Sequence, residues 1–145
     1  MMCTQKPAAS FQVKRLTFLL LLMTSSVACA EWEQTPHKGE ETSTHYHDKS
    51  TIKGTSSVVK MTTMIDYSVA KNLKSGNQYA SVKRVDGYDC RYGTSAPITV
   101  SYFSGSVSTG ELVYAYTVKN SDLEWEPVAA SALIEKHWKI ACGKD

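Results

Sequence analysis

An alternation of apolar and polar side chains from Val58 to Tyr67 constrains the fold of this chain more than any other feature. Every second residue of the segment would lie on one face of a strand: Val59, Met61, Thr63, Ile65 and Tyr67. Lys60, Thr62 and Asp66 would point the other way. Successive side chains of a strand point to opposite faces, whereas a helix repeats every three to four residues. The segment is therefore predicted to be a strand with one face toward a core.

The same period of two recurs along the chain between turn-rich segments. Further strands are predicted at 31–35, 44–48, 79–90, 98–104 and 112–118, with loops at 37–42, 49–57, 70–77 and 105–110. Gly87 lies inside a strand, where an isolated glycine often marks a bulge. Short connections between apolar runs are typical of hairpins, so an antiparallel sheet is expected.

The period changes after Pro127. Apolar residues then recur at three- and four-residue spacings: Leu133, Ile134, His137, Trp138 and Ala141. Ser131 is a good N-cap, so residues 131–142 are predicted to be a helix, with Trp138 in the core. The expected fold class is α+β: an antiparallel β-sheet of about six strands with one C-terminal helix packed on one face.

Residues 1–30 have the pattern of a signal peptide. Lys14 and Arg15 precede an apolar run at 16–23, and Ala28-Cys29-Ala30 matches the small-x-small cleavage pattern. We expect cleavage after Ala30 and a single domain at 31–145. The apolar run is much shorter than the roughly 20 residues that cross a bilayer, so an exported protein without a membrane span is expected.

A second interpretation of the leader is a lipid anchor. Ser26-Val27-Ala28-Cys29 resembles a bacterial lipobox, in which Cys29 would be lipidated. A lipobox usually has Leu three residues before the cysteine, where this chain has Ser26. Plain secretion is therefore favoured over lipidation.

Charge gives no indication of a nucleic-acid partner. The whole chain has 16 basic and 14 acidic residues. Three of the basic residues, Lys6, Lys14 and Arg15, lie in the leader, which leaves 13 basic against 14 acidic residues and a net charge of −1. Without a basic surplus, neither nucleic acid nor an anionic membrane is expected as the partner.

Two cysteines remain once the leader is removed. Cys3 and Cys29 belong to the leader, whereas Cys90 and Cys142 lie in the predicted domain. An oxidising compartment permits one bridge between them, which would join the end of the helix to a strand. No C-x-x-C spacing is present, so the predicted disulfide is structural rather than redox-active.

No sequence motif indicates catalysis or a cofactor. Asp86 and Asp89 are two carboxylates near a strand end, which are usually solvated, and no nucleophile or phosphate-binding motif accompanies them. We expect a non-enzymatic protein with no cofactor.

His45 and His47 are the best candidates for metal ligands. Residues i and i+2 of a strand share a face, so both imidazoles can approach one ion. A third ligand would have to come from His37, His137 or a carboxylate. Since two ligands are not a site, the two histidines are predicted to face water, and no metal is expected.

The many tyrosines of the chain are more informative about function than its histidines. Tyr102, Tyr114 and Tyr116 lie in the predicted hairpin at positions that can share one face. Clustered exposed tyrosines are typical of protein–protein contacts, although any single ring more often packs in a core. The partner would be a host protein or the second subunit of a homodimer.

Several segments, in order, resemble the surface-adhesin protein E family of Gram-negative bacteria. They are Glu31-Trp32, 46–52 (Y-H-D-K-S-T-I), Tyr88-Asp89-Cys90, 102–105 (Y-F-S-G), 110–114 (G-E-L-V-Y), 125–128 (W-E-P-V) and 138–142 (W-K-I-A-C). The resemblance implies a small exported domain with an antiparallel sheet, a C-terminal helix and one disulfide. It also implies adhesion to host extracellular-matrix or plasma proteins.

The expected function is that of an exported, non-enzymatic binding domain in the periplasm or at the cell surface. The alternative is a periplasmic or envelope-associated structural protein with no host ligand. The motif residues of the family are packing and turn residues, so the resemblance transfers no binding site.

Overall fold

The structure is a computed structural model that describes residues 30–38, 42–55 and 57–144. Residues 1–29 of the predicted signal peptide, which include the lipid-anchor candidate Cys29, lie outside these residues, and cleavage after Ala30 stays a prediction. Among the described residues, no helix has the length and apolar composition needed to cross a bilayer.

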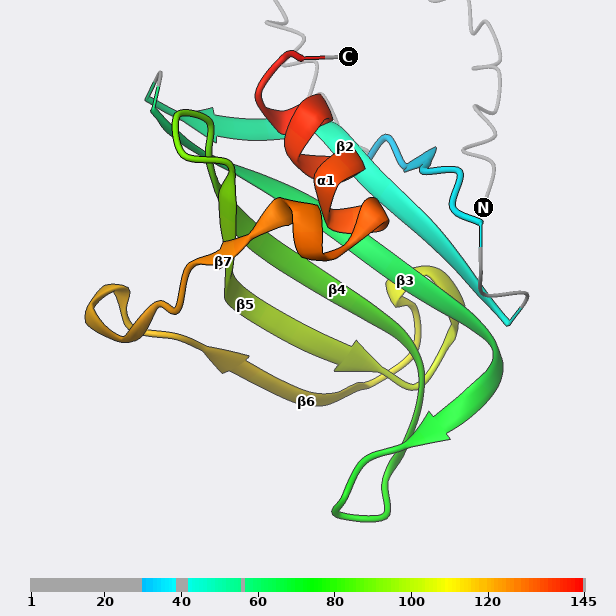
Figure 1. The fold of residues 1–145 in the computed structure, drawn as a ribbon. Helices are drawn as coiled ribbons and strands as arrows, with labels where there is room; N and C mark the ends of the chain where they lie inside the picture. Colours follow the sequence, from blue (N-terminus) through cyan, green and yellow to red (C-terminus); the bar gives the residue numbers. More distant parts are fainter. Residues whose placement is uncertain (1–29, 39–41, 56, 145) are drawn as a thin grey trace, which may run out of the picture.

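One antiparallel sheet forms the body of the described chain (Figure 1). Its strands are β1 (Glu33–Gln34), β2 (Ser43–Gly54), β3 (Val58–Asn72), β4 (Gln78–Asp89), β5 (Thr94–Phe103), β6 (Leu112–Thr117) and β7 (Glu126–Pro127). The first six lie side by side in chain order, and β7 pairs with β5. Each of the first six strands therefore pairs with its neighbour in sequence, as the short connections predict.

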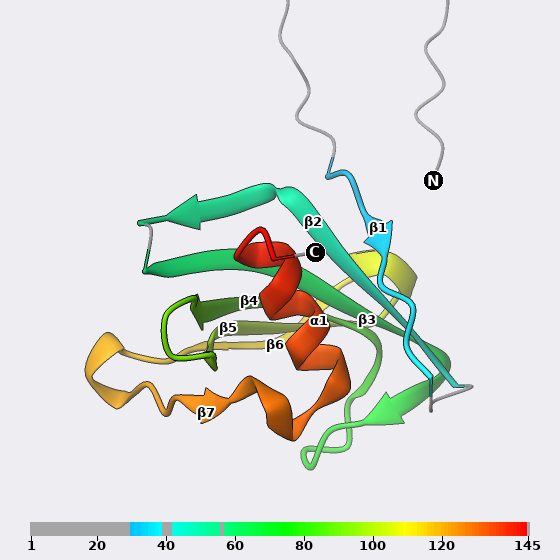
Figure 2. The same ribbon diagram turned by 45° about the horizontal axis from the view of Figure 1, so that its top comes forward.

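Within the described ranges there is a single α-helix, α1 (Ala132–Ala141), which packs on one face of the sheet (Figure 2). Ser131 is its N-cap, because its side chain accepts a hydrogen bond from the Ile134 N–H. The helix lies over β2 and β3, at the N-terminal side of the sheet (Figure 1). The structure confirms the predicted fold class.

Several strand ends differ from the predicted ones. β2 continues to Gly54 and β3 continues to Asn72, through polar segments that were expected to be loops. Lys53 pairs with Lys60 and Gly54 with Val59, so backbone pairing extends the hairpin beyond its apolar part. β1 is only Glu33–Gln34, β5 begins at Thr94, and the two-residue strand β7 was not predicted.

The core lies between α1 and the sheet. Met61, Tyr88 and Ala141 are buried together, and Trp138 packs against them. The Trp138 ring N–H donates a hydrogen bond to the Asp89 carbonyl oxygen at 2.9 Å. Cys90 and Cys142 form a disulfide beside this cluster. The bridge thus joins the end of α1 to the end of β4, and Trp138 contributes to the core as predicted.

The 105–110 connection covers part of the opposite face of the sheet. It contains the 3-10 turn η1 (Ser106–Ser108). The Ser81 hydroxyl donates to the Gly105 carbonyl at 2.6 Å and accepts from the Ser108 N–H at 2.9 Å. Met64, which is fully buried, receives a hydrogen bond from the Ser108 hydroxyl. β3 is therefore buried on both faces at this point.

The bulge expected at Gly87 lies elsewhere. The register between β4 and β5 shifts between Val85 and Asp86, whereas Gly87 pairs regularly with Ala96. A side chain at Gly87 would lie 3.2 Å from the Trp125 ring. The absence of a side chain at Gly87 therefore leaves room for the Trp125 ring and does not produce a β-bulge at Gly87.

Candidate protein-binding face

Two rows of paired residues cross the sheet on its helix-bearing face. One row consists of His45, Ile65, Val82, Tyr102 and Tyr114. The other consists of His47, Thr63, Arg84, Val100 and Tyr116. Both rows lie on the helix side, because Met61 is buried against Ala141 of α1 and Thr63 and Ile65 follow it with a period of two. Each row runs from a histidine on β2 to a tyrosine on β6.

The histidine end of the rows is buried. His45 and His47 are 7% and 4% exposed, so the prediction that they face water is wrong. The Thr35 hydroxyl lies 2.8 Å from Nδ1 of His47 and 3.2 Å from Nε2 of His137. Burial follows because α1 and the segment before β2 close over this end, and neither contact is visible in the local sequence.

The environment of the histidines disfavours protonation of His137. Burial, together with the nearby His47, His45, Arg84 and His37, lowers the pKa of His137 to about 3. The imidazole is therefore neutral inside the folded protein at ordinary pH.

In the part of the chain that the structure describes, His45 and His47 do not belong to an arrangement of metal ligands. Nε2 of His47 lies 3.6 Å from the Glu33 carboxylate. However, no group of three or more His, Cys, Asp or Glu residues within the described ranges has an arrangement that would hold a metal ion. The cluster is best described as a packed polar end of the core.

An ion pair occupies the middle of the face. The Arg84 guanidinium contacts the Asp86 carboxylate at 2.7 Å, and Thr63 donates to the same carboxylate at 3.1 Å. Asp86 is only 6% exposed, so the prediction of a solvated carboxylate there is wrong. Burial raises the pKa of the Asp86 carboxyl, while Arg84 and Thr63 oppose that rise. Asp89 instead accepts the N–H groups of Arg91 and Tyr92 in the turn after β4.

The tyrosine end of the rows is open. Five rings contact one another in sequence, with centroid distances of 5.8, 4.9, 6.0 and 6.0 Å: Tyr67, Tyr79, Tyr102, Tyr114 and Tyr116. We call these five residues the tyrosine ladder. Tyr114 is 52% and Tyr116 is 40% exposed, so neither packs in the core. The prediction that Tyr102, Tyr114 and Tyr116 share one face is confirmed, and Tyr67 and Tyr79 extend the group.

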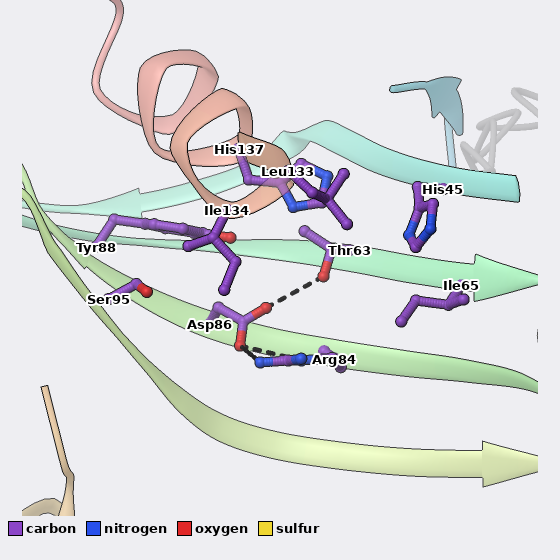
Figure 3. A pocket seen from close by; sticks show the side chains of 10 residues that line it. All are labelled: His45, Thr63, Ile65, Arg84, Asp86, Tyr88, Ser95, Leu133, Ile134 and His137. Carbon is purple, nitrogen blue, oxygen red and sulfur yellow. Dashed lines mark hydrogen bonds and ion pairs between the residues drawn. The ribbon is translucent and has the colours of Figure 1, made fainter. Parts of the chain in front are cut away.

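Hollows connect the ladder to the helix. The tyrosine ladder borders a hollow of about 270 Å³. The segment after β6 borders a second hollow, of about 320 Å³. A small pocket of about 40 Å³ lies under α1 between His45, Asp86 and Ile134 (Figure 3). Arg84 lines all three, so it lies where the covered and uncovered parts of the face meet.

Sequence reasoning missed Tyr67, Tyr79 and Arg84 as members of this face. Tyr67 was placed on the correct side of its strand, but its contact with Tyr79 depends on the register shift between Asp66 and Lys71. A signal for Arg84 was available in the sequence: Arg84 lies two residues from both Val82 and Asp86, so all three share one face of β4. Aromatic rings in edge-to-face and tilted contact, beside the polar side chains of Arg84 and Asp86, form a surface suited to binding another protein.

Comparison with known proteins gives a family and a fold. The family model described as surface-adhesin protein E matches residues 32–143. No curated protein matches the sequence. Among solved structures, crystal form II of Haemophilus influenzae protein E matches with a TM-score of 0.53 and 10% identity, covering 68% of this chain and 80% of that one.

Two further structures of protein E give the same fold. The selenomethionine form from Haemophilus influenzae has a TM-score of 0.52, with 10% identity and 68% and 78% coverage of the two chains. Protein E from non-typeable Haemophilus influenzae has a TM-score of 0.50, with 10% identity and 68% and 69% coverage. At this identity the likeness concerns the fold alone.

Proposed function

This chain belongs to the surface-adhesin protein E family, and from that premise we propose that it is an exported, non-enzymatic adhesin. Its ligands are host extracellular-matrix or plasma proteins, and the tyrosine ladder is the contact surface. The observation that carries the proposal is the exposure of Tyr114 and Tyr116 on a face that is covered at its other end. Tyrosine is enriched at protein interfaces because it combines a large ring with a directed hydrogen bond.

The shape of the face supports a protein ligand rather than a small one. The ladder crosses four strands, and the hollow that it borders is open to solvent. A small-molecule site is usually a closed cavity, whereas a protein contact is a broader surface with a few aromatic anchors. Tyr114 and Tyr116 are the expected anchors.

A binding assay with a matched control tests the proposal. Bacteria that express the full chain, or its Tyr114→Ala/Tyr116→Ala variant, are applied to immobilised matrix and plasma proteins. Loss of two anchors should weaken binding about tenfold or more. Tyr92→Ala is the control, because Tyr92 is 74% exposed but lies in the turn after β4, outside the ladder. Equal loss in both variants, or in neither, would contradict the role of the ladder.

Surface location needs its own test. Protease added to intact cells should digest the protein without lysis if it meets host ligands. Full protection of the protein until the outer membrane is broken would favour the alternative, a periplasmic structural role.

A further inference from the structure

The outer edge of β6 can accept another strand. Val118 donates its N–H to the Ile98 carbonyl at 2.8 Å, and Tyr116 pairs with Val100 in the same register. Because N–H groups alternate in direction along an antiparallel strand, the Ala115 and Thr117 amides point away from β5. β6 is the last strand of the sheet path among the described residues (Figure 1).

Negative charge lies beside this edge. Asp122, Glu124 and Glu126 line the hollow that follows β6. Among the described residues that line it, Arg84 is the one cation, and its charge is balanced by Asp86 at 2.7 Å. A partner entering this hollow therefore meets uncompensated carboxylates, which favour cations and repel anions.

The ladder itself already binds a cation. The Lys71 ammonium lies 5.5 Å from the centroid of the Tyr67 ring, within the range of a cation–π contact. The faces of Tyr114 and Tyr116 are more exposed and continue the same series of rings. Lysine and arginine side chains of a partner are chemically suited to both the rings and the carboxylates.

We infer that β6 binds an extended segment rich in lysine and arginine, contributed by a partner protein, as an added antiparallel strand. Backbone hydrogen bonds form with the outward amides of Ala115 and Thr117, as in other β-strand additions. Alternate side chains of the added strand then lie on the face of Tyr114 and Tyr116, where their cations meet the rings and the carboxylates. The inference rests on the proposed adhesin function and specifies the chemistry of the ligand.

Peptide probes test the charge and the backbone pairing separately. The full chain is titrated with a labelled eight-residue peptide that alternates Lys and Thr, with its Glu–Thr counterpart, and with Lys–Thr peptides methylated on one or the other set of alternate amides. The Lys–Thr peptide should bind and the Glu–Thr peptide should not. Methylation on the set that faces β6 should weaken binding roughly tenfold, because those amides can no longer donate hydrogen bonds to the β6 edge.

Variants of β6 and the acidic segment provide the matching test. Ala115→Pro removes an outward N–H that the β5 pairing does not use, and edge strands tolerate proline there. It should weaken binding of the Lys–Thr peptide at least fivefold, whereas Ala115→Ser should bind like the parent. Asp122→Asn with Glu124→Gln should weaken binding a few-fold and reduce its dependence on salt.

The alternatives give distinct results. Unchanged affinity of Ala115→Pro, with its circular dichroism intact, would overturn the inference. Heparin binding that requires Tyr114, without binding of the Lys–Thr peptide, would replace it with an anionic glycan. Self-association that Ala115→Pro abolishes would replace it with a second copy of the chain. Matrix-protein binding lost in Tyr114→Ala/Tyr116→Ala but kept in Ala115→Pro would overturn this inference alone, whereas peptide binding without matrix-protein binding would overturn only the proposed function.

Discussion

The two ends of one sheet face have opposite environments. On β2, His45 and His47 are almost fully buried beneath α1, while on β6 their row partners Tyr114 and Tyr116 are about half exposed. The more polar residue type is inside and the more apolar one is outside. What decides burial here is where the helix lies on the sheet, rather than the hydrophobicity of each residue.

Tyrosine shows the same contrast within one residue type. Tyr88 is 1% exposed and packs with Met61 under α1, whereas Tyr114 is 52% exposed beyond the reach of the helix. Burial raises the pKa of Tyr88 well above its usual value. The covered end therefore stabilises the fold, and the open end is available to a partner.

Removing the disulfide should produce the largest loss of stability. The chain-entropy treatment assigns about 4 kcal/mol to a bridge between residues 52 apart. Cys90→Ala/Cys142→Ala should lower the free energy of unfolding by that order, measured by urea denaturation. A loss below about 1 kcal/mol would show that the covered end does not depend on this link.

Truncating Trp138 should reduce the free energy of unfolding nearly as much as removing the disulfide. The ring packs against Met61, Tyr88 and Ala141, and its loss leaves a cavity and removes the hydrogen bond to the Asp89 carbonyl. Trp138→Ala should reduce stability by about 3 kcal/mol, the lower part of the usual range because the side chain is only half-buried. Unchanged melting with lost ligand binding would mean that Trp138 belongs to the binding surface instead.

Acid should destabilise the histidine end. His137 has a pKa of about 3 in the folded protein and about 6.5 when unfolded, so the unfolded chain takes up a proton first as pH falls. The stability that the folded protein gains from a neutral His137 is complete above pH 6.5. It is lost progressively as the pH falls from 6.5 to 3. Stability should fall by about 2 kcal/mol from pH 7 to pH 5. In His137→Gln this part of the pH dependence should disappear; an identical pH profile would contradict the shift.

Truncating a ladder ring should have the smallest effect on stability. Tyr114 is half exposed and lies on the last strand of the sheet path, so Tyr114→Ala should change the free energy of unfolding by less than about 1 kcal/mol. Thermal melting beside Trp138→Ala gives the direct contrast. Comparable destabilisation in both variants would remove the distinction between the two ends.

Local sequence was sufficient for the elements but not for their environment. The alternation around Met61 and the N-cap at Ser131 predicted a strand and a helix that the structure contains. The burial of His45 depends on where α1 and the segment before β2 lie, which period-two patterns do not encode. Similarly, the burial of Asp86 follows from the position of α1, whose Leu133 and Ile134 line the same pocket. Arg84 compensates the Asp86 charge from the same face of β4.

Photo-crosslinking on host matrix tests the division between the two ends most directly. A photoreactive phenylalanine analogue replaces Tyr116 on the ladder or Tyr92 in the turn after β4, in full-length protein displayed on bacteria attached to host extracellular matrix. Both positions are exposed, at 40% and 74%. We predict crosslinks to a matrix protein from position 116 and none from position 92. Crosslinks from position 92 alone, or equally from both, would contradict the assignment of binding to the open tyrosine end.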